Sequence, residues 1–388
     1  MPVRDFTIEV AAADIDDLNA RLSATRWPAG TRSDWAEGTE PGYLRRLLDM
    51  WAREFNWKAE QDALNRLRQI EFRSADGTIV HAIHVRGTGA RPLPLIMTHG
   101  WPSSLVEWRH VVGPLADPAA HGGNPGDSFD VVAPCLPGFG FSTSRPGAAH
   151  TIEDTARLWA ELMQELGYQR FAAQGCDWGA LVTAHLGRLF PDRVAAIHLG
   201  VLPVAPASDD PLTAFDRRTA RWRAAEYGYA AIQGTKPQSL AYALADSPAG
   251  LAAWIAEKWR SWSDCAGEPE SAIDVADLLA TISLFWFTRS IGTASRIYAA
   301  NPPELLTLPA GTRVIPPAGF CFQHTRGDDD PRSFLAVPRP GAPPRILAEQ
   351  VFDVRRWAEL DRGGHFPALE VPQTFVEELR TFFRPFRT

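Results

Sequence analysis

The chain has 388 residues, of which 45% are hydrophobic and 22% are charged, and it carries a formal net charge of -7 at pH 7. This length and composition suffice for one large globular domain or for two. The acidic balance argues against a basic surface of the kind that binds nucleic acid, so we expect a small-molecule substrate instead.

Cysteine usage and hydropathy bear on the compartment. The four cysteines lie far apart without a C-x-x-C spacing, at Cys135, Cys176, Cys265 and Cys321. This pattern predicts neither a metal site nor a disulfide framework, and it fits a reducing cytoplasm. The first residues lack an apolar signal region, and the longest apolar run, 278–287, is too short to span a bilayer, so we expect no membrane anchor.

The first 70 residues have helical periodicity. Apolar residues recur at spacings of three and four, as at Leu18 and Leu22 and again at Leu47, Leu48 and Trp51. We therefore expect residues 1–70 to form a helical segment that packs on a larger core.

From residue 70 onward the pattern changes. Apolar and polar residues alternate over 70–73 and 78–85 on either side of Gly77, which predicts a hairpin. Short buried strands then alternate with helices, with strands at 93–98, 129–134, 167–173 and 195–199 and helices at 105–112, 152–166 and 181–189. This alternation predicts an α/β architecture with a mostly parallel central sheet and right-handed crossovers.

Residues 206–300 interrupt this alternation. They are helical and aromatic in pattern, which predicts a helical lid inserted into the sheet domain. Strand patterns resume at 312–316 and 351–357, and a last helix covers 373–383. The core domain is therefore predicted to comprise 71–205 and 301–388.

The sequence Gly175-Cys176-Asp177-Trp178-Gly179 lies between a predicted strand and a predicted helix. Small residues on both sides of a central side chain are typical of the nucleophile elbow, a sharp turn that raises a reactive group above a parallel sheet. The central group here is a carboxylate, Asp177. Attack by a carboxylate on an sp3 carbon gives an ester of the enzyme, so the pattern indicates alkyl transfer rather than acyl transfer.

Hydrolysis of such an ester requires a base and an oxyanion hole. His365, between a glycine and an aromatic residue after the last strand, is the base candidate among ten histidines. A loop histidine that only packs is the alternative, but a nucleophile first and a histidine last is the chain order of an α/β-hydrolase. The predicted oxyanion donors are the backbone N–H groups of Trp178 and Trp101.

The chain resembles the microsomal-type epoxide hydrolases, enzymes of the α/β-hydrolase fold with a characteristic amino-terminal segment. The resemblance covers nearly the whole chain and rests on Thr25-Arg26-Trp27-Pro28, Phe55-Asn56-Trp57, His99-Gly100-Trp101-Pro102, the Asp177 elbow, 228–237, 246–254 and 363–370. It extends to bacterial members that act in natural-product pathways, and it implies conversion of an epoxide to a vicinal diol.

Two lid tyrosines of that family donate hydrogen bonds to the epoxide oxygen, and Tyr229 and Tyr298 stand at the matching places. The chemistry needs such donors, because an alkoxide leaves poorly unless protons meet its developing charge. From the residues alone, both tyrosines would be interpreted as lid packing.

The third member of the triad departs from the family pattern. An acid is usual shortly after the strand that ends at Phe322, but this chain has Thr325 there, which cannot supply a charge. The nearest carboxylates are Asp328, Asp329 and Asp330, of which Asp328 is placed first because it is closest to the strand end. A solvated acidic turn is the alternative for any one of them, and Asp209 or Asp210 offers another topological location.

The sequence therefore predicts an epoxide hydrolase that needs no cofactor and no metal, acting in natural-product biosynthesis or detoxification. A haloalkane dehalogenase would share Asp-Trp-Gly at the elbow but would need halide-binding donors in place of the tyrosine pair. A catalytically silent binding protein is favoured only by Thr325. Cys176 is interpreted as a small packing residue, and a homodimer is compatible with the chain although no motif requires one.

Overall fold

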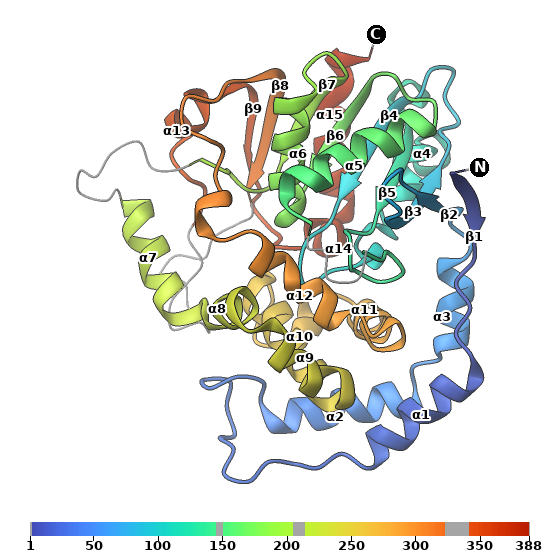
Figure 1. Cartoon of the computed structure of the whole chain (residues 1–388), viewed down its shortest axis with the longest axis vertical. Helices are drawn as coiled ribbons and strands as arrows, with labels where there is room; N and C mark the ends of the chain where they lie inside the picture. The colour runs from blue at the N-terminus through green and yellow to red at the C-terminus, as the bar shows by residue number, and fades with distance from the viewer. Residues whose placement is uncertain (1, 145–149, 205–213, 323–340, 388) are drawn as a thin grey trace.

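The computed structural model describes residues 2–144, 150–204, 214–322 and 341–387. Within these ranges a nine-stranded sheet has the order β1-β2-β3-β5-β4-β6-β7-β8-β9 (Figure 1). The strands are β1 (Val3–Phe6), β2 (Gln69–Arg73), β3 (Ile79–Val85), β4 (Leu93–Thr98), β5 (Phe129–Pro134), β6 (Phe171–Gly175), β7 (Val194–Leu199), β8 (Val314–Phe322) and β9 (Phe352–Glu359).

The sheet is antiparallel at one end and parallel through the rest. Strands β1, β2, β3 and β5 pair antiparallel, whereas the five pairings from β5–β4 to β8–β9 are parallel. The hairpin predicted around Gly77 is confirmed as β2 and β3, and Gly77 adopts a φ of 87° in its turn. The mostly parallel central sheet is also confirmed.

Helices cover both faces of the sheet. Ile197 of β7 lies beside α6, and the next residue, His198, packs on Phe382 of α15, so these two helices cover opposite faces. The helices of the sheet domain are α4 (Val112–Ala116), α5 (Ile152–Glu165), α6 (Trp178–Leu189), α13 (Arg345–Glu349), α14 (Pro367–Glu370) and α15 (Pro372–Phe383).

One predicted helix is wrong in its extent. The segment 105–112 is not a single helix: a 3-10 turn covers Leu105–Trp108, and α4 begins at Val112. Pro114 explains the break, since a proline is tolerated in the first turn of a helix but would clash with the preceding turn of a continuous one.

Six helices lie between β7 and β8 in the described part of the chain and form the lid. They are α7 (Ala214–Glu226), α8 (Gly228–Thr235), α9 (Pro237–Asp246), α10 (Pro248–Trp262), α11 (Val275–Thr288) and α12 (Ile291–Ala300). Figure 1 shows α8 to α12 together at one end of the sheet domain, between it and the amino-terminal helices α1 (Ala12–Ser23) and α2 (Pro41–Arg53), with α7 at the left beside α8.

The amino-terminal segment holds the lid from the outside. Trp51 of α2 donates a 2.8 Å hydrogen bond from Nε1 to Ser283 Oγ of α11, and the Tyr43 hydroxyl donates to Glu270 at 3.0 Å. Helix α3 (Trp57–Leu64) adds Glu60, which forms an ion pair with Arg109 of the core at 2.7 Å. These contacts connect the segment to both other parts of the molecule.

The amino-terminal segment is not wholly helical, which differs from the sequence prediction. Residues Val3–Phe6 form β1, with Val3 paired to Phe72 of β2. We propose the division into 1–70, a core of 71–205 and 301–388, and a lid of 206–300 as the domain organisation, with β1 and the start of β2 joined to the core sheet.

Two further observations concern the whole described chain. All four cysteines are buried free thiols. Among the described residues, no helix combines the length and the apolar character that crossing a membrane requires.

Candidate active site

Asp177 lies at the turn between β6 and α6 in a strained conformation. Its φ of 51° and ψ of -125° are unusual for a residue that is not glycine. The neighbouring Gly179 makes this turn possible, because an added Cβ there would lie 1.9 Å from the Thr98 carbonyl oxygen. The sequence Gly-x-Asp-x-Gly therefore folds as the predicted elbow.

The two carboxylate oxygens of Asp177 have different partners. Oδ1 accepts a 3.0 Å hydrogen bond from the backbone N–H of Trp101, and Oδ2 lies 3.4 Å from His365 Nε2. Burial raises the pKa of Asp177, but His365 and the backbone N–H groups of Trp101 and Trp178 outweigh it, so the pKa is lowered overall. The group is an anion at neutral pH, and its side chain remains 22% exposed.

The turn His99-Gly100-Trp101 brings the backbone N–H of Trp101 to this carboxylate. Gly100 is required at the contact, since a Cβ there would lie 2.2 Å from Asp177 Oδ1. The His99 imidazole is buried, with Nε2 accepting from the Leu136 N–H at 3.3 Å and Nδ1 2.9 Å from the Gly100 carbonyl oxygen. Burial lowers the pKa of His99 to about 4, so the ring is neutral. It connects the backbone N–H of Leu136 to the carbonyl oxygen of Gly100.

His365 is buried on the loop between β9 and α14, and Glu370 fixes this loop. The Glu370 carboxylate accepts hydrogen bonds from three backbone N–H groups, those of Gly364 at 2.8 Å, Phe366 at 2.8 Å and Asp264 at 2.6 Å. The His365 N–H donates to the Trp262 carbonyl oxygen at 2.7 Å. The loop is thereby tied to the end of lid helix α10. The sequence reasoning missed this function of Glu370.

Tyr229 of α8 and Tyr298 of α12 meet over the elbow. Both are buried, and their ring centroids are 5.8 Å apart. Tyr229 stacks on Trp101 at 5.1 Å, and Tyr298 lies edge-on to Trp178 at 4.8 Å and to Trp101 at 5.9 Å, so both rings contact predicted oxyanion residues. Burial, with Tyr229 and the negative charge of Asp177, raises the pKa of Tyr298 well above its usual value, so its hydroxyl keeps its proton.

Two buried acidic groups beside the elbow are neutral at pH 7. Burial raises the pKa of Cys176 well above its usual value and raises that of Glu107 to about 8. The structure agrees with Cys176 as a packing residue, since a thiol that holds its proton is a poor nucleophile. Glu107 was missed in the sequence, where nothing distinguishes it from a surface glutamate.

The carboxylates considered for the triad cannot be placed. Thr325, Asp328, Asp329 and Asp330 lie outside the described residues, and so do Asp209 and Asp210. The assignment of the acid stays a prediction.

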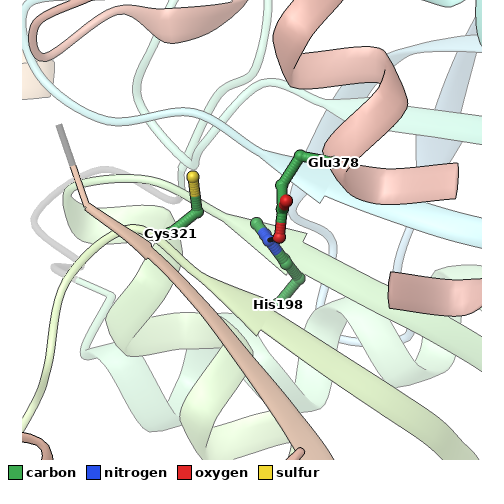
Figure 2. Close-up of side chains that lie close together, drawn as sticks. All are labelled: His198, Cys321 and Glu378. Carbon is green, nitrogen blue, oxygen red and sulfur yellow. Dashed lines mark ion pairs between the residues drawn. The ribbon is translucent and has the colours of Figure 1, made fainter. Parts of the chain in front are cut away.

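One group of potential metal ligands occurs among the described residues, away from the elbow. His198, Cys321 and Glu378 place their ligand atoms within 4.8 Å of one another, and Figure 2 shows the imidazole and the carboxylate side by side with the thiol nearby. However, Arg356 donates to both oxygens of Glu378, at 2.6 Å and 2.5 Å. Burial also raises the pKa of Cys321 to about 12, which opposes the thiolate that a metal requires. We therefore interpret this group as a buried ion-pair network.

Comparisons with known proteins agree with this geometry. The family described as "Epoxide hydrolase N terminus" matches residues 3–108, and the family described as "alpha/beta hydrolase fold" matches residues 94–262. The chain is 38% identical to a protein assigned as an epoxide hydrolase in Stigmatella aurantiaca (strain DW4/3-1), with 99% of this chain and 86% of the relative covered. It is 31% identical to Epoxide hydrolase 1 of Oryctolagus cuniculus, with 98% and 88% covered.

The structure is similar to that of the Aspergillus niger epoxide hydrolase, with a TM-score of 0.81 at 25% identity, covering 100% of this chain and 97% of that one. The predicted α/β-hydrolase fold is thus confirmed. The identity to these relatives over nearly the full chain shows that the protein belongs to the epoxide hydrolase family and is a hydrolase that acts on epoxides.

Proposed function

We propose that this epoxide hydrolase works through a covalent ester on Asp177, and that Oδ2 is the attacking atom. Oδ1 is already held by the Trp101 N–H, as the carbonyl oxygen of an ester would be. Oδ2 attacks an oxirane carbon from the side opposite the C–O bond, which breaks and leaves its electron pair on the oxygen.

Tyr229 and Tyr298 are the proposed donors to that oxygen. Their hydroxyls lie together above the elbow, and one of them transfers a proton to the developing alkoxide. The result is a hydroxyalkyl ester of Asp177 and a tyrosinate.

His365 is the proposed base for the second step. Its Nε2 faces Oδ2, so a water molecule near the ester bond can lose its proton to the imidazole as its oxygen attacks the ester carbon. The N–H groups of Trp101 and Trp178 stabilise the tetrahedral oxyanion. Collapse releases the vicinal diol and the carboxylate, and the proton held by the imidazole returns to the tyrosinate. Asp328 is the proposed acid that orients the imidazolium, with Asp329 and Asp330 as alternatives.

The observation that carries this mechanism is the division of the Asp177 carboxylate between an N–H donor on Oδ1 and the histidine on Oδ2. Intact-protein mass spectrometry of His365→Gln mixed with styrene oxide tests it. We expect a mass gain of one epoxide, and no gain when Asp177→Asn is added. Absence of the adduct while the wild type makes diol would contradict the ester mechanism.

We propose that the substrates are epoxides with an aryl or similar apolar substituent, because aromatic side chains surround the elbow. Such substrates fit a role in natural-product biosynthesis or detoxification. Trp101, Trp262, Tyr229 and Tyr298 all lie within ring contact of one another or of His365. Relative kcat/KM for styrene oxide and 1,2-epoxypropane tests this preference.

We also propose a cytoplasmic location, supported by four buried free thiols, and cell fractionation tests it.

A further inference from the structure

Lys258 of α10 is a buried cation on the tyrosine pair. Its side chain is only 8% exposed, and Nζ lies 4.8 Å from the centroid of the Tyr229 ring. Trp101 stacks on the same ring, with an angle of 11° between the planes. Tyr229 therefore contacts both an indole and a positive charge.

This position is not explained by ion pairing alone. Nζ forms a 2.6 Å ion pair with Glu257, whose side chain is 23% exposed. A lysine and a glutamate can make such a pair at the surface, where it contributes little to stability, whereas burial of an ammonium is costly. Placement over a ring that faces the predicted reaction centre suggests a role in the chemistry.

Two acidic groups and one guanidinium lie around Lys258, and the Glu257 carboxylate offsets part of its field. Glu226 at the end of α7 lies close enough for the lysine to lower its pKa, but burial raises that pKa overall and so favours the neutral acid. On α10, Glu257 is the direct partner, and the Arg260 guanidinium adds a further positive charge that stacks on Trp35 at 4.3 Å.

We propose that Lys258 makes Tyr229 the proton donor of the pair, while Tyr298 donates a hydrogen bond and keeps its proton. This inference rests on the proposed ester mechanism. As the oxirane C–O bond breaks, the Tyr229 proton moves to the alkoxide oxygen and the ring becomes a phenolate. A cation over the ring stabilises the phenolate more than the neutral phenol, so it lowers the barrier to ring opening. Lys258 is thus a positioning residue that acts through Tyr229.

The test is the rate of Asp177 ester formation in single turnover with styrene oxide, followed by rapid quench and intact mass. Lys258→Met should slow this step by about 30-fold, the rate equivalent of a desolvated cation–π contact. Lys258→Arg keeps the charge and should stay within about threefold of the wild type. Lys58→Met is the matched control on α3, where the lysine is 69% exposed, and should leave the rate unchanged.

A double-mutant cycle separates this role from general packing. The effect of Lys258→Met should disappear in a Tyr229→Phe background and persist in a Tyr298→Phe background. If Lys258→Met does not fold by circular dichroism, Lys258→Gln takes its place. An unchanged rate, an equal loss in both backgrounds or an arginine variant as slow as the methionine variant would overturn the proposal. A wild type that makes diol without forming the ester would overturn both the mechanism and the lysine proposal, whereas normal ester formation in Lys258→Met would overturn only the latter.

Discussion

The elbow and the lid place reactive groups by different physical means. At the elbow, the backbone positions the nucleophile. Asp177 adopts a strained conformation that close-packed glycines permit, and peptide N–H groups bind its carboxylate. In the lid, side-chain packing positions the reactive groups, because Tyr229 and Tyr298 are held by ring contacts with Trp101 and Trp178. Backbone constraints leave a local signature in the sequence, whereas packing constraints do not.

Substitutions at the elbow should reduce activity more than substitutions in the lid. Asp177→Asn removes the charge of the nucleophile but keeps the hydrogen bond to Trp101, so kcat should fall by about 10⁴-fold or more with the fold retained. Steady-state diol formation measures the loss, and thermal melting serves as the control. Residual activity above about 1% of wild type, after exclusion of deamidation by mass, would contradict the account.

Loss of the acid that supports His365 should have the next largest effect on activity. Asp328→Asn should lower kcat by about 10³-fold, because the imidazolium would lose its counter-charge, and the Asp177 ester should accumulate. Asp329→Asn and Asp330→Asn are the matched controls, because they are the next two residues in the same run of aspartates. If one of them shows the loss and Asp328→Asn does not, the acid belongs at that position.

The lid tyrosines should both contribute to ring opening, Tyr229 as the proton donor and Tyr298 as a hydrogen-bond donor. Tyr229→Phe and Tyr298→Phe should each slow ester formation by about 10²-fold, and the double variant should lose more than either alone. The second step should be unchanged, since neither hydroxyl contributes to ester hydrolysis. Rapid-quench mass spectrometry separates the two steps. A double variant that opens the epoxide at the wild-type rate would remove the lid from the mechanism.

Glu370 joins the two regions, and its loss should have a moderate effect. Glu370→Gln presents an amide N–H₂ to at least one of three backbone donors, at a cost of about 1–3 kcal/mol in the free energy of unfolding. We expect about a tenfold slower ester hydrolysis, because the His365 loop shifts, with ring opening unaffected. Urea unfolding measures the loss of stability, and the ratio of the rates of ester formation and ester hydrolysis measures the effect on the second step. Equal slowing of both steps would indicate a general loss of structure instead.

Glu107 should affect stability rather than activity. The folded pKa of about 8 lies above the unfolded value, so the folded state holds a proton that the unfolded chain releases between about pH 4.5 and 8. The free energy of unfolding should therefore fall with rising pH in this window, by about 1.4 kcal/mol per unit at most. Glu107→Gln should remove this part of the slope, as urea unfolding at pH 5, 6.5 and 8 would measure. A wild-type slope no steeper than that of the variant would contradict a neutral Glu107.

The limits of the sequence prediction follow the same division. The elbow, the hairpin at Gly77 and the mostly parallel sheet follow from local patterns of glycine and hydrophobic residues. Tyr229 and Tyr298 were named through family resemblance alone. Strand β1 was missed because four residues with a mixed pattern become a strand only when the free edge of β2 is available.

Glu370, Glu107 and Lys258 were missed for a related reason. Each is a charged residue whose type suggests the surface, but Glu107 and Lys258 are buried and Glu370 is half-buried in the folded chain. The Asp264 donor to Glu370 comes from the lid, and the ring under Lys258 comes from another lid helix, so both contacts exist only in the folded chain.

The most direct test of the central claim is a single turnover of unlabelled enzyme in H₂¹⁸O, with excess enzyme over styrene oxide. The ester mechanism predicts that the first diol contains no ¹⁸O and that the peptide containing Asp177 gains one ¹⁸O atom. Labelled diol together with an unlabelled Asp177 peptide would mean that water attacks the epoxide directly, and it would contradict the nucleophilic role of Asp177.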